Sequence, residues 1–158
     1  MRRAARAVIV QDGQLLVMKR NKYGQEYYTL IGGGIKAGET PEQALVREVA
    51  EEASIRVTAL RHIFTEDAGA PFGPQYIYLC EHVIGTPRLA PHSEELAINK
   101  LGQNLHEPMW MPLDKLAEVP FRSEALKYAL LEAFEKGFPD QPVLIDPSHY
   151  HHAIHKRS

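Results

Sequence analysis

Three glutamates that could bind a metal lie close together in the chain, at Glu48, Glu51 and Glu52. In a helix, spacings of three and four residues place side chains on one face. Carboxylate oxygens are ligands that Mg²⁺ takes together with water and substrate phosphates. Glutamates also favour solvated helix surfaces, but Glu51 and Glu52 in the last turn oppose the helix dipole, and Glu48 and Glu52 are like charges four residues apart. We therefore predict a site for Mg²⁺, with Mn²⁺ as a possible substitute.

The segment that carries these glutamates is predicted to be a helix from Pro41 to about Ala53. Thr40 is the expected N-cap, Pro41 suits the first helical position, and Gln43 completes a capping box. The apolar side chains of this helix are expected to pack on one arc, and the glutamates are expected to be exposed on the opposite arc. The apolar arc consists of Leu45, Val46, Val49, Ala50 and Ala53.

A run of three glycines, Gly32, Gly33 and Gly34, precedes this helix. From Gly33 onward the spacing fits a phosphate-binding P-loop, but Glu39 occupies the lysine position and would repel phosphates. From Gly32 onward it also fits a dinucleotide-binding fingerprint, G-x-G-x-x-A, although the helix should then begin several residues earlier. The glycines could let the backbone approach a substrate closely, or they could form a turn without a ligand.

Glycines, helix and carboxylates together closely resemble the Nudix box, G-x5-E-x7-R-E-U-x-E-E-x-G-U, where U is a bulky apolar residue. The pattern fixes nine positions, and the sequence from Gly33 to Ile55 satisfies eight of them. The departure is Ser54, where the family has a glycine that ends the helix. A left-handed residue other than glycine costs on the order of 1 kcal/mol there. The departure therefore concerns the helix end and leaves the carboxylates in place.

The resemblance to Nudix hydrolases implies an α/β fold, an α/β/α sandwich with a mixed central sheet. It also implies Mg²⁺-dependent hydrolysis of the diphosphate linkage of a small nucleoside diphosphate derivative. Glu48, Glu51 and Glu52 would hold the metal, and Glu48 would accept the proton of the attacking water. Glu39 and Arg47 are expected to form an ion pair, with Arg47 also reaching phosphate. Many relatives add a further acidic residue, for which Glu94, Glu95 and Glu107 are the candidates.

Several alternatives within this interpretation stay open. The substrate could be a nucleoside triphosphate, oxidised or not, ADP-ribose or another nucleotide sugar. Pro71 lies sixteen residues after the box, a spacing similar to that in ADP-ribose hydrolases of the family. A Nudix-like module that senses a nucleotide without hydrolysis is the alternative function, but it is expected to lose box carboxylates that this sequence keeps. Aromatic residues that could stack on a base are Tyr23, Tyr27, Tyr28, Phe72 and Tyr76.

The elements around the box are predicted to be strands and one further long helix. Asp12 and Gly13 favour the tight turn of a hairpin between two apolar runs. A third strand, 27–31, is expected to end at the glycines, after a polar stretch over 21–26. The remaining predictions are strands over 54–66, 75–84 and 108–111, a short helix from Ser93, and an amphipathic helix over 123–136 closed by Gly137.

Length and composition limit the class of protein. The 158 residues fit one domain over 1–146, followed by a His-rich tail over 147–158 that is expected to be poorly ordered. A net charge of −2 predicts a small nucleotide as partner and no polymeric nucleic acid. Apolar runs are too short to span a membrane, and a lone Cys80 fits the cytoplasm. A homodimer is left open. The tail histidines are His149, His151, His152 and His155, of which two have ligand spacing.

Overall fold

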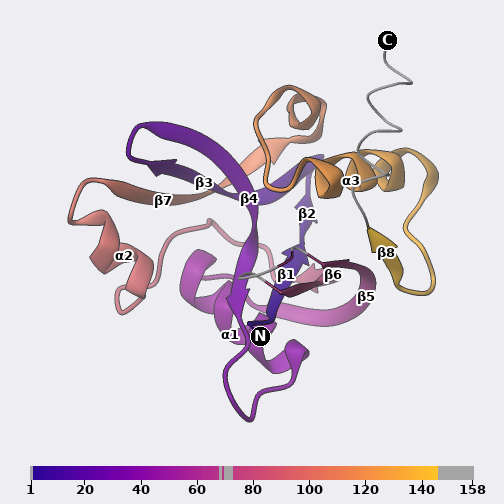
Figure 1. The fold of residues 1–158 in the computed structure, drawn as a ribbon, viewed down its shortest axis with the longest axis horizontal. Coiled ribbons are helices and arrows are strands. Elements are labelled where there is room, and N and C mark those ends of the chain that lie inside the picture. Colours follow the sequence, from indigo (N-terminus) through magenta and orange to yellow (C-terminus); the bar gives the residue numbers. More distant parts are fainter. Residues whose placement is uncertain (1, 68, 70–72, 146–158) are drawn as a thin grey trace.

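The computed structural model describes residues 2–67, 69 and 73–145. Three predictions concern residues outside these ranges: the position of Pro71, stacking by Phe72, and the state of the tail over 147–158. The described chain forms a mixed sheet between two long helices, which confirms the predicted α/β class (Figure 1).

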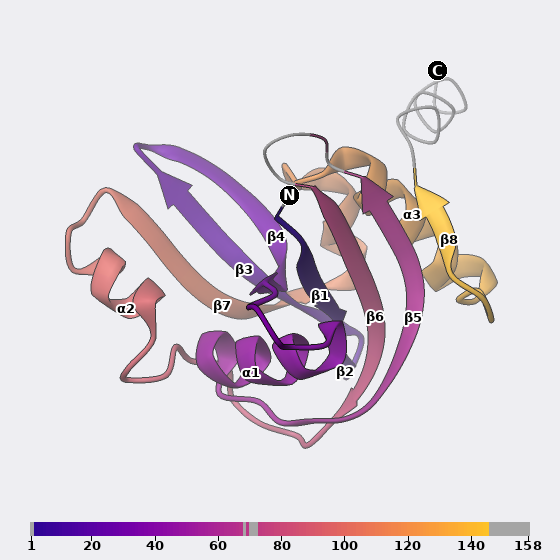
Figure 2. The ribbon, with the colours of Figure 1, turned by 60° about the horizontal axis from the view of Figure 1, so that its bottom comes forward.

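Eight strands make up the sheet, in the order β2-β3-β4-β1-β6-β5-β8, with β7 paired to β3. Strands β1 and β6 are parallel, as are β5 and β8, whereas the other pairs are antiparallel. Figure 2 shows the long β5–β6 pair beside β1, and α1 lying across this part of the sheet. The strands are β1 (Ala4–Val8), β2 (Val10–Gln11), β3 (Gln14–Lys22), β4 (Gln25–Gly34), β5 (Val57–Asp67), β6 (Pro74–His82), β7 (Asn104–Pro112) and β8 (Val143–Ile145).

The hairpin predicted at Asp12 and Gly13 is confirmed, because both residues have positive φ and join β2 to β3. The polar stretch over 21–26 was predicted only to precede the third strand, but it contains the paired ends of two strands and the turn between them. Tyr23 and Gly24 form a second positive-φ turn, so β3 and β4 pair up to the register of Lys22 with Gln25. The predicted break at the glycines is wrong as well. Strand β4 continues to Gly34, because its backbone there still pairs with β1.

The helices follow their capping signals. Helix α1 (Pro41–Ala53) begins at Thr40 with the complete capping box, and α2 (Glu94–Asn99) and α3 (Glu124–Lys136) are capped by Ser93 and Ser123. A 3₁₀ helix, η1 (Leu113–Glu118), was not predicted. No helix among the described residues is long and apolar enough to cross a membrane.

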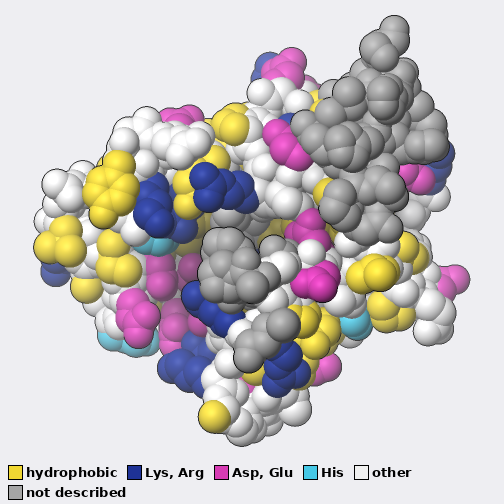
Figure 3. All heavy atoms as spheres, in the orientation of Figure 1, with side chains coloured by type: hydrophobic (Ala, Val, Ile, Leu, Met, Phe, Trp, Pro, Cys, Tyr) yellow, Lys and Arg dark blue, Asp and Glu magenta, His cyan; other side chains and the backbone are white. Residues whose placement is uncertain are grey.

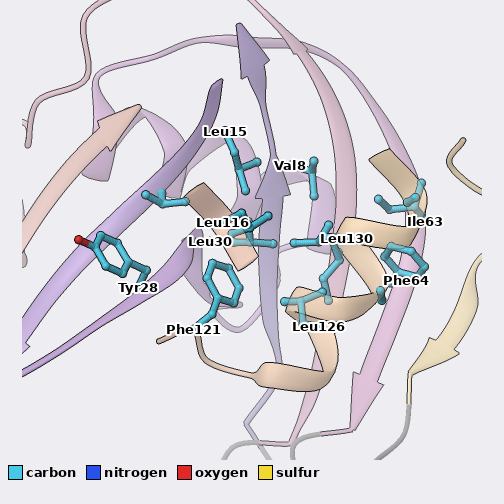
Figure 4. Close-up of a cluster of buried hydrophobic side chains, with 14 of the residues drawn as sticks. Val8, Leu15, Tyr28, Leu30, Ile63, Phe64, Leu116, Phe121, Leu126 and Leu130 are labelled. Carbon is cyan, nitrogen blue, oxygen red and sulfur yellow. The ribbon is translucent and has the colours of Figure 1, made fainter. Parts of the chain in front are cut away.

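Two apolar clusters fill the two sides of the sheet. One packs the sheet against α3 and η1, with residues such as Leu30, Leu116 and Leu130 at its centre (Figure 4). The other packs the opposite side against α1 through Leu45 and Val49. The α1 side carries the Nudix-like box, so this packing fixes the helix that presents the glutamates.

Candidate active site

Helix α1 presents its acidic residues differently from the prediction. The buried stripe of α1 contains Leu45, Val49 and Ala53, and it also contains Glu52, which is only 8% exposed. Val46, predicted to pack, is 43% exposed. Residues at i, i+4, i+7 and i+8 share one helix face, so Glu52 falls between Val49 and Ala53 on the packed side. The expectation of an exposed acidic arc is therefore wrong for Glu52, and Glu48 and Glu51 are half-buried rather than exposed.

Glu52 is anchored to the glycine run. Its Oε1 accepts a hydrogen bond of 2.8 Å from the backbone N–H of Gly32. Gly32 has φ of +146°, and a Cβ there would lie 2.1 Å from the carbonyl oxygen of Ala5 in β1. Only glycine fits this position, because the obstacle is backbone. The close approach that Gly32 permits is between two strands of the chain itself.

The neighbouring glycines leave room for charged side chains. A Cβ on Gly33 would lie 2.7–2.8 Å from the carboxylate atoms of Glu48, and one on Gly34 would lie 3.5 Å from the guanidinium of Arg2. Gly33 thus lets the carboxylate of Glu48 lie against the β4 backbone. Any contact of these glycines with a substrate stays a prediction.

Arg47 is the centre of an ion-pair network with Glu39, Glu48 and Glu51. Its Nε and Nη2 donate to the two oxygens of Glu39 at 2.7 and 2.9 Å. Its Nη1 donates to Glu48 at 2.9 Å and to Glu51 at 3.4 Å, and its Nη2 also donates to the carbonyl of Gly34 at 3.1 Å. The hydrogen bonds that Arg47 donates to Glu39 lower the pKa of Glu39 to about 2, and the same bonds raise the pKa of Arg47.

Burial outweighs the compensation at Glu52 and Glu48. Burial raises the pKa of Glu52 to about 8, against the opposing effects of Arg6 and of the Gly32 N–H. Burial also raises the pKa of Glu48 despite its bond to Arg47. The charge of Glu51 raises the pKa of Glu48 further, and the charge of Glu48 raises that of Glu52, as expected for clustered carboxylates.

Of the three candidates for a further carboxylate, Glu95 lies within electrostatic reach of this cluster. Burial raises the pKa of Glu95, and the charges of Glu48 and Glu51 raise it further. The charge of Glu94, its neighbour in α2, also raises the pKa of Glu95. Glu107 lies on β7, opposite Lys19 of β3 in the strand register. All three were candidates in the sequence, and the electrostatic interaction with Glu48 and Glu51 favours Glu95 as the further carboxylate of the site.

The donor set fits a hard divalent cation. Glu48, Glu51 and Glu52 each use one carboxylate oxygen in the bonds above, and the second oxygen of each has no hydrogen-bond partner among the described residues. No group of three or more His, Cys, Asp or Glu in the described ranges is arranged so that it could hold a metal ion as it stands, so the three glutamates offer the donor chemistry rather than a formed site. The set is all oxygen and carries excess negative charge, which suits Mg²⁺ or Mn²⁺ rather than a thiophilic metal.

One member of the site was not recognised as a candidate in the sequence. Arg6, in β1, donates to the carbonyl of Gly32 at 3.0 Å, and its charge acts on Glu52 and Glu48. Desolvation lowers the pKa of Arg6. The available signal was an arginine inside the apolar run ARAVIV, because a cation in a buried strand requires a partner.

The aromatic candidates lie in different environments. Tyr23 is 74% exposed in the β3–β4 turn, and Tyr28 belongs to the α3-side cluster. Tyr76 packs against the α1-side cluster. Tyr27 lines a cavity of about 340 Å³ that Arg6 also lines. Only Tyr27 is therefore brought beside the candidate site by a described cavity.

Comparison with known proteins identifies the family. The NUDIX domain profile matches residues 1–134. The chain belongs to the NUDIX family. It is 27% identical over 112 residues to the NAD-capped RNA hydrolase NudC of Edwardsiella ictaluri, a match that covers 71% of this chain and 39% of NudC. It is 33% identical over 111 residues to the oxidized purine nucleoside triphosphate hydrolase of Mus musculus, covering 68% of this chain and 61% of that one.

Solved structures agree with the fold. The crystal structure of an ADP-ribose pyrophosphatase from Streptococcus suis matches with a TM-score of 0.64 and 21% identity, covering 90% of this chain and 98% of that one. The chain spans about two fifths of the length of the NudC relatives that it matches. The protein is thus a member of the NUDIX family, and its activity and substrate need a separate argument.

Proposed function

We propose that this Nudix hydrolase cleaves the diphosphate linkage of a small nucleoside diphosphate derivative in a reaction that depends on Mg²⁺. The observation that supports this most strongly is Glu52. A carboxylate that is 8% exposed, with a pKa raised to about 8 and other carboxylates nearby, destabilises the metal-free protein. A divalent cation would remove that penalty.

Glu48, Glu51 and Glu52 would hold the cation through their second oxygens. Such an ion would neutralise the negative charge of the diphosphate oxygens and would lower the pKa of a bound water molecule. Glu48 lies beside Gly33 on the face of α1 and is the residue that we propose accepts a proton from that water. Glu95 would add a further carboxylate from α2.

Arg47 acts on this site as a positioning residue in our proposal. All three of its side-chain nitrogens already donate to Glu39, Glu48, Glu51 or the Gly34 carbonyl. A guanidinium with its donors engaged has little left for a phosphate. The Glu39–Arg47 pair would therefore hold the loop and aim Glu48, rather than bind substrate.

The substrate class follows from the cavity and the charge. The named relatives act on NAD-capped RNA, oxidised purine nucleoside triphosphates or ADP-ribose. A cavity of about 340 Å³ lies at the lower end of the range for small-molecule sites. Together with the net charge of −2, this favours one small nucleotide over a polymeric nucleic acid.

A hydrolysis screen tests the proposal. Nucleoside triphosphates, ADP-ribose, NAD⁺ and nucleotide sugars are incubated with and without Mg²⁺, and the products are identified. We expect metal-dependent release of a nucleoside monophosphate, loss of turnover in Glu48→Gln, and parental turnover in Glu135→Gln, a matched change on the exposed side of α3. Tight nucleotide binding without any turnover would overturn hydrolysis and favour a sensing module.

A further inference from the structure

The cavity beside the candidate active site is strongly cationic. Its described lining residues include four arginines from three segments of the chain, whereas the whole protein has a net charge of −2. Figure 3 shows Lys and Arg side chains close to a group of Asp and Glu side chains on one face of the molecule. The charged lining residues are Arg2, Arg6, Arg20, Arg122 and Glu66.

Neutral groups hold three of these four arginines in place. Arg20 donates to Asn104 and to the carbonyl of Leu105, and the Arg122 guanidinium lies 4.1 Å from the ring centroid of Tyr27. Arg6 donates to backbone carbonyls and to Gln75. None of the ion pairs formed within the described ranges includes an arginine of this cavity.

Glu66 is the acidic side chain among the described lining residues, and it does not neutralise the arginines. It is buried in the cavity wall and accepts a hydrogen bond from the hydroxyl of Ser123. Burial raises the pKa of Glu66. The cavity therefore keeps a surplus of positive charge, arranged as guanidinium groups that match phosphate oxygens in geometry.

The cavity and the carboxylate site share a wall. Arg6 lines the cavity and donates to the Gly32 carbonyl at 3.0 Å, and the Gly32 N–H donates to Glu52 at 2.8 Å. A diphosphate bound at the α1 glutamates would thus place an attached group beside the arginines. The volume of about 340 Å³ suits one such group.

We propose that this cavity selects substrates that carry a phosphate group in addition to the diphosphate that is hydrolysed, with Arg2, Arg20 and Arg122 as the specificity-determining residues. This inference rests on the proposed function. The extra phosphate could be a monoester on a sugar or the third phosphate of a triphosphate chain. A neutral sugar would leave the guanidinium charges unpaired in a partly enclosed space, so it would bind more weakly.

Two matched pairs of substrates test the selection. We compare kcat/KM for NADP⁺ against NAD⁺, which differ by a ribose phosphate, and for GTP against GDP, which differ by a chain phosphate. We expect a preference of about 10-fold or more for the phosphate-rich member of one pair, as one charge-assisted bidentate contact supplies. The pair that shows it identifies the source of the phosphate, and equal values in both pairs would overturn the inference.

Variants of the arginines connect the preference to the cavity. In Arg2→Gln and Arg122→Gln the ratio within the preferred pair should fall several-fold toward one, and Arg122→Lys should retain part of it because charge remains without the planar fork. Arg61→Gln, on the exposed side of β5, is the matched control and should keep the parental ratio. A parental ratio in both glutamine variants would remove these residues from the proposal.

Binding without turnover separates this inference from the proposed function. In chelator, calorimetry compares 2′,5′-ADP with 5′-AMP, and GTP with GDP. We expect tighter and more salt-sensitive binding of the phosphate-rich ligand in one pair, with the difference reduced in Arg122→Gln. If no substrate is hydrolysed but this difference is present, the proposed reaction fails and the phosphate selection stands. Hydrolysis without any difference in binding or kcat/KM overturns the selection alone.

Discussion

Helices α1 and α3 cover opposite sides of the sheet and look alike in sequence terms. Each has 13 residues, each begins at a hydroxyl N-cap, and each packs leucine and alanine side chains into an apolar cluster. Each also buries one charged residue, Glu52 in α1 and Lys127 in α3. The two buried charges differ in how far their surroundings compensate them.

Lys127 is fully compensated. Its ammonium group lies 2.8 Å from Glu124 and donates to the carbonyls of Val119 and Ala117 at 2.8 and 3.4 Å. Glu52 accepts one hydrogen bond, from the Gly32 N–H, and the charge of Arg6 favours its carboxylate, but burial outweighs both and Glu48 and Glu95 add repulsion. Compensation offsets the desolvation cost of a buried charge, whereas a buried charge that is not fully compensated is a cost that function can explain.

The largest effect that we expect from this contrast is a loss of turnover when Glu52 is replaced. Glu52→Gln keeps the side-chain shape and the acceptor for Gly32 but removes the charge. We expect metal-dependent kcat/KM to fall about 100-fold or more, the scale on which misplaced reacting groups cost rate. The metal-free variant should be at least as stable as the parent, because repulsion and the dipole penalty are relieved.

Melting temperatures with and without Mg²⁺ accompany the kinetic measurement. The parent should gain stability from the metal by mass action, and Glu52→Gln should gain less. Parental turnover together with an unchanged metal response would show that Glu52 is merely a buried structural residue, like Lys127.

The matched change on the other helix should have the opposite effect on stability. Lys127→Met removes the ammonium group, leaves the carbonyls of Ala117 and Val119 without their donor and removes the ion-pair partner of Glu124. We expect a loss of about 1–3 kcal/mol in the free energy of unfolding, measured by urea denaturation, with parental kcat/KM. A stabilised variant would remove the contrast between the two helices.

Dependence on pH should distinguish the helices further. The pKa of Glu52 is raised from 4.5 to about 8 in the folded protein, so the folded chain retains a proton that the unfolded chain has released. Stability of the metal-free protein should therefore fall as pH rises from about 4.5 to about 8, by at most about 1.4 kcal/mol per pH unit from this group. Unfolding in chelator across this range should show a flatter profile in Glu52→Gln, and identical profiles would contradict the assignment.

The smallest effect concerns the helix ends. α3 ends at Gly137, whereas α1 ends at Ser54, which has a left-handed φ of 56° and donates through Oγ to the carbonyl of Arg88 at 2.7 Å. Ser54→Gly relieves about 1 kcal/mol of backbone cost and loses a hydrogen bond of similar value. We expect stability within about 0.5 kcal/mol of the parent by thermal melting. A gain above 1 kcal/mol would show that the bond to Arg88 contributes nothing.

Local signals accounted for most of the elements. Thr40, Pro41 and Gln43 predicted the start of α1, and Asp12 and Gly13 predicted the first hairpin, because capping and positive-φ turns depend on a few adjacent residues. The extension of β4 through Gly34 was missed, because its pairing with β1 joins residues 30 apart in the chain.

The sequence by itself determined the family and the identity of the acidic residues, since the box is a contiguous pattern of residue types. Only the tertiary structure decided what surrounds them. Glu52 is the buried carboxylate of the box because its position on α1 faces β4. Arg6 lies near it because β1 pairs with β4. The arginine cavity likewise combines residues from β1, β3 and the start of α3, and burial and charge clustering arise only when such distant segments pack together.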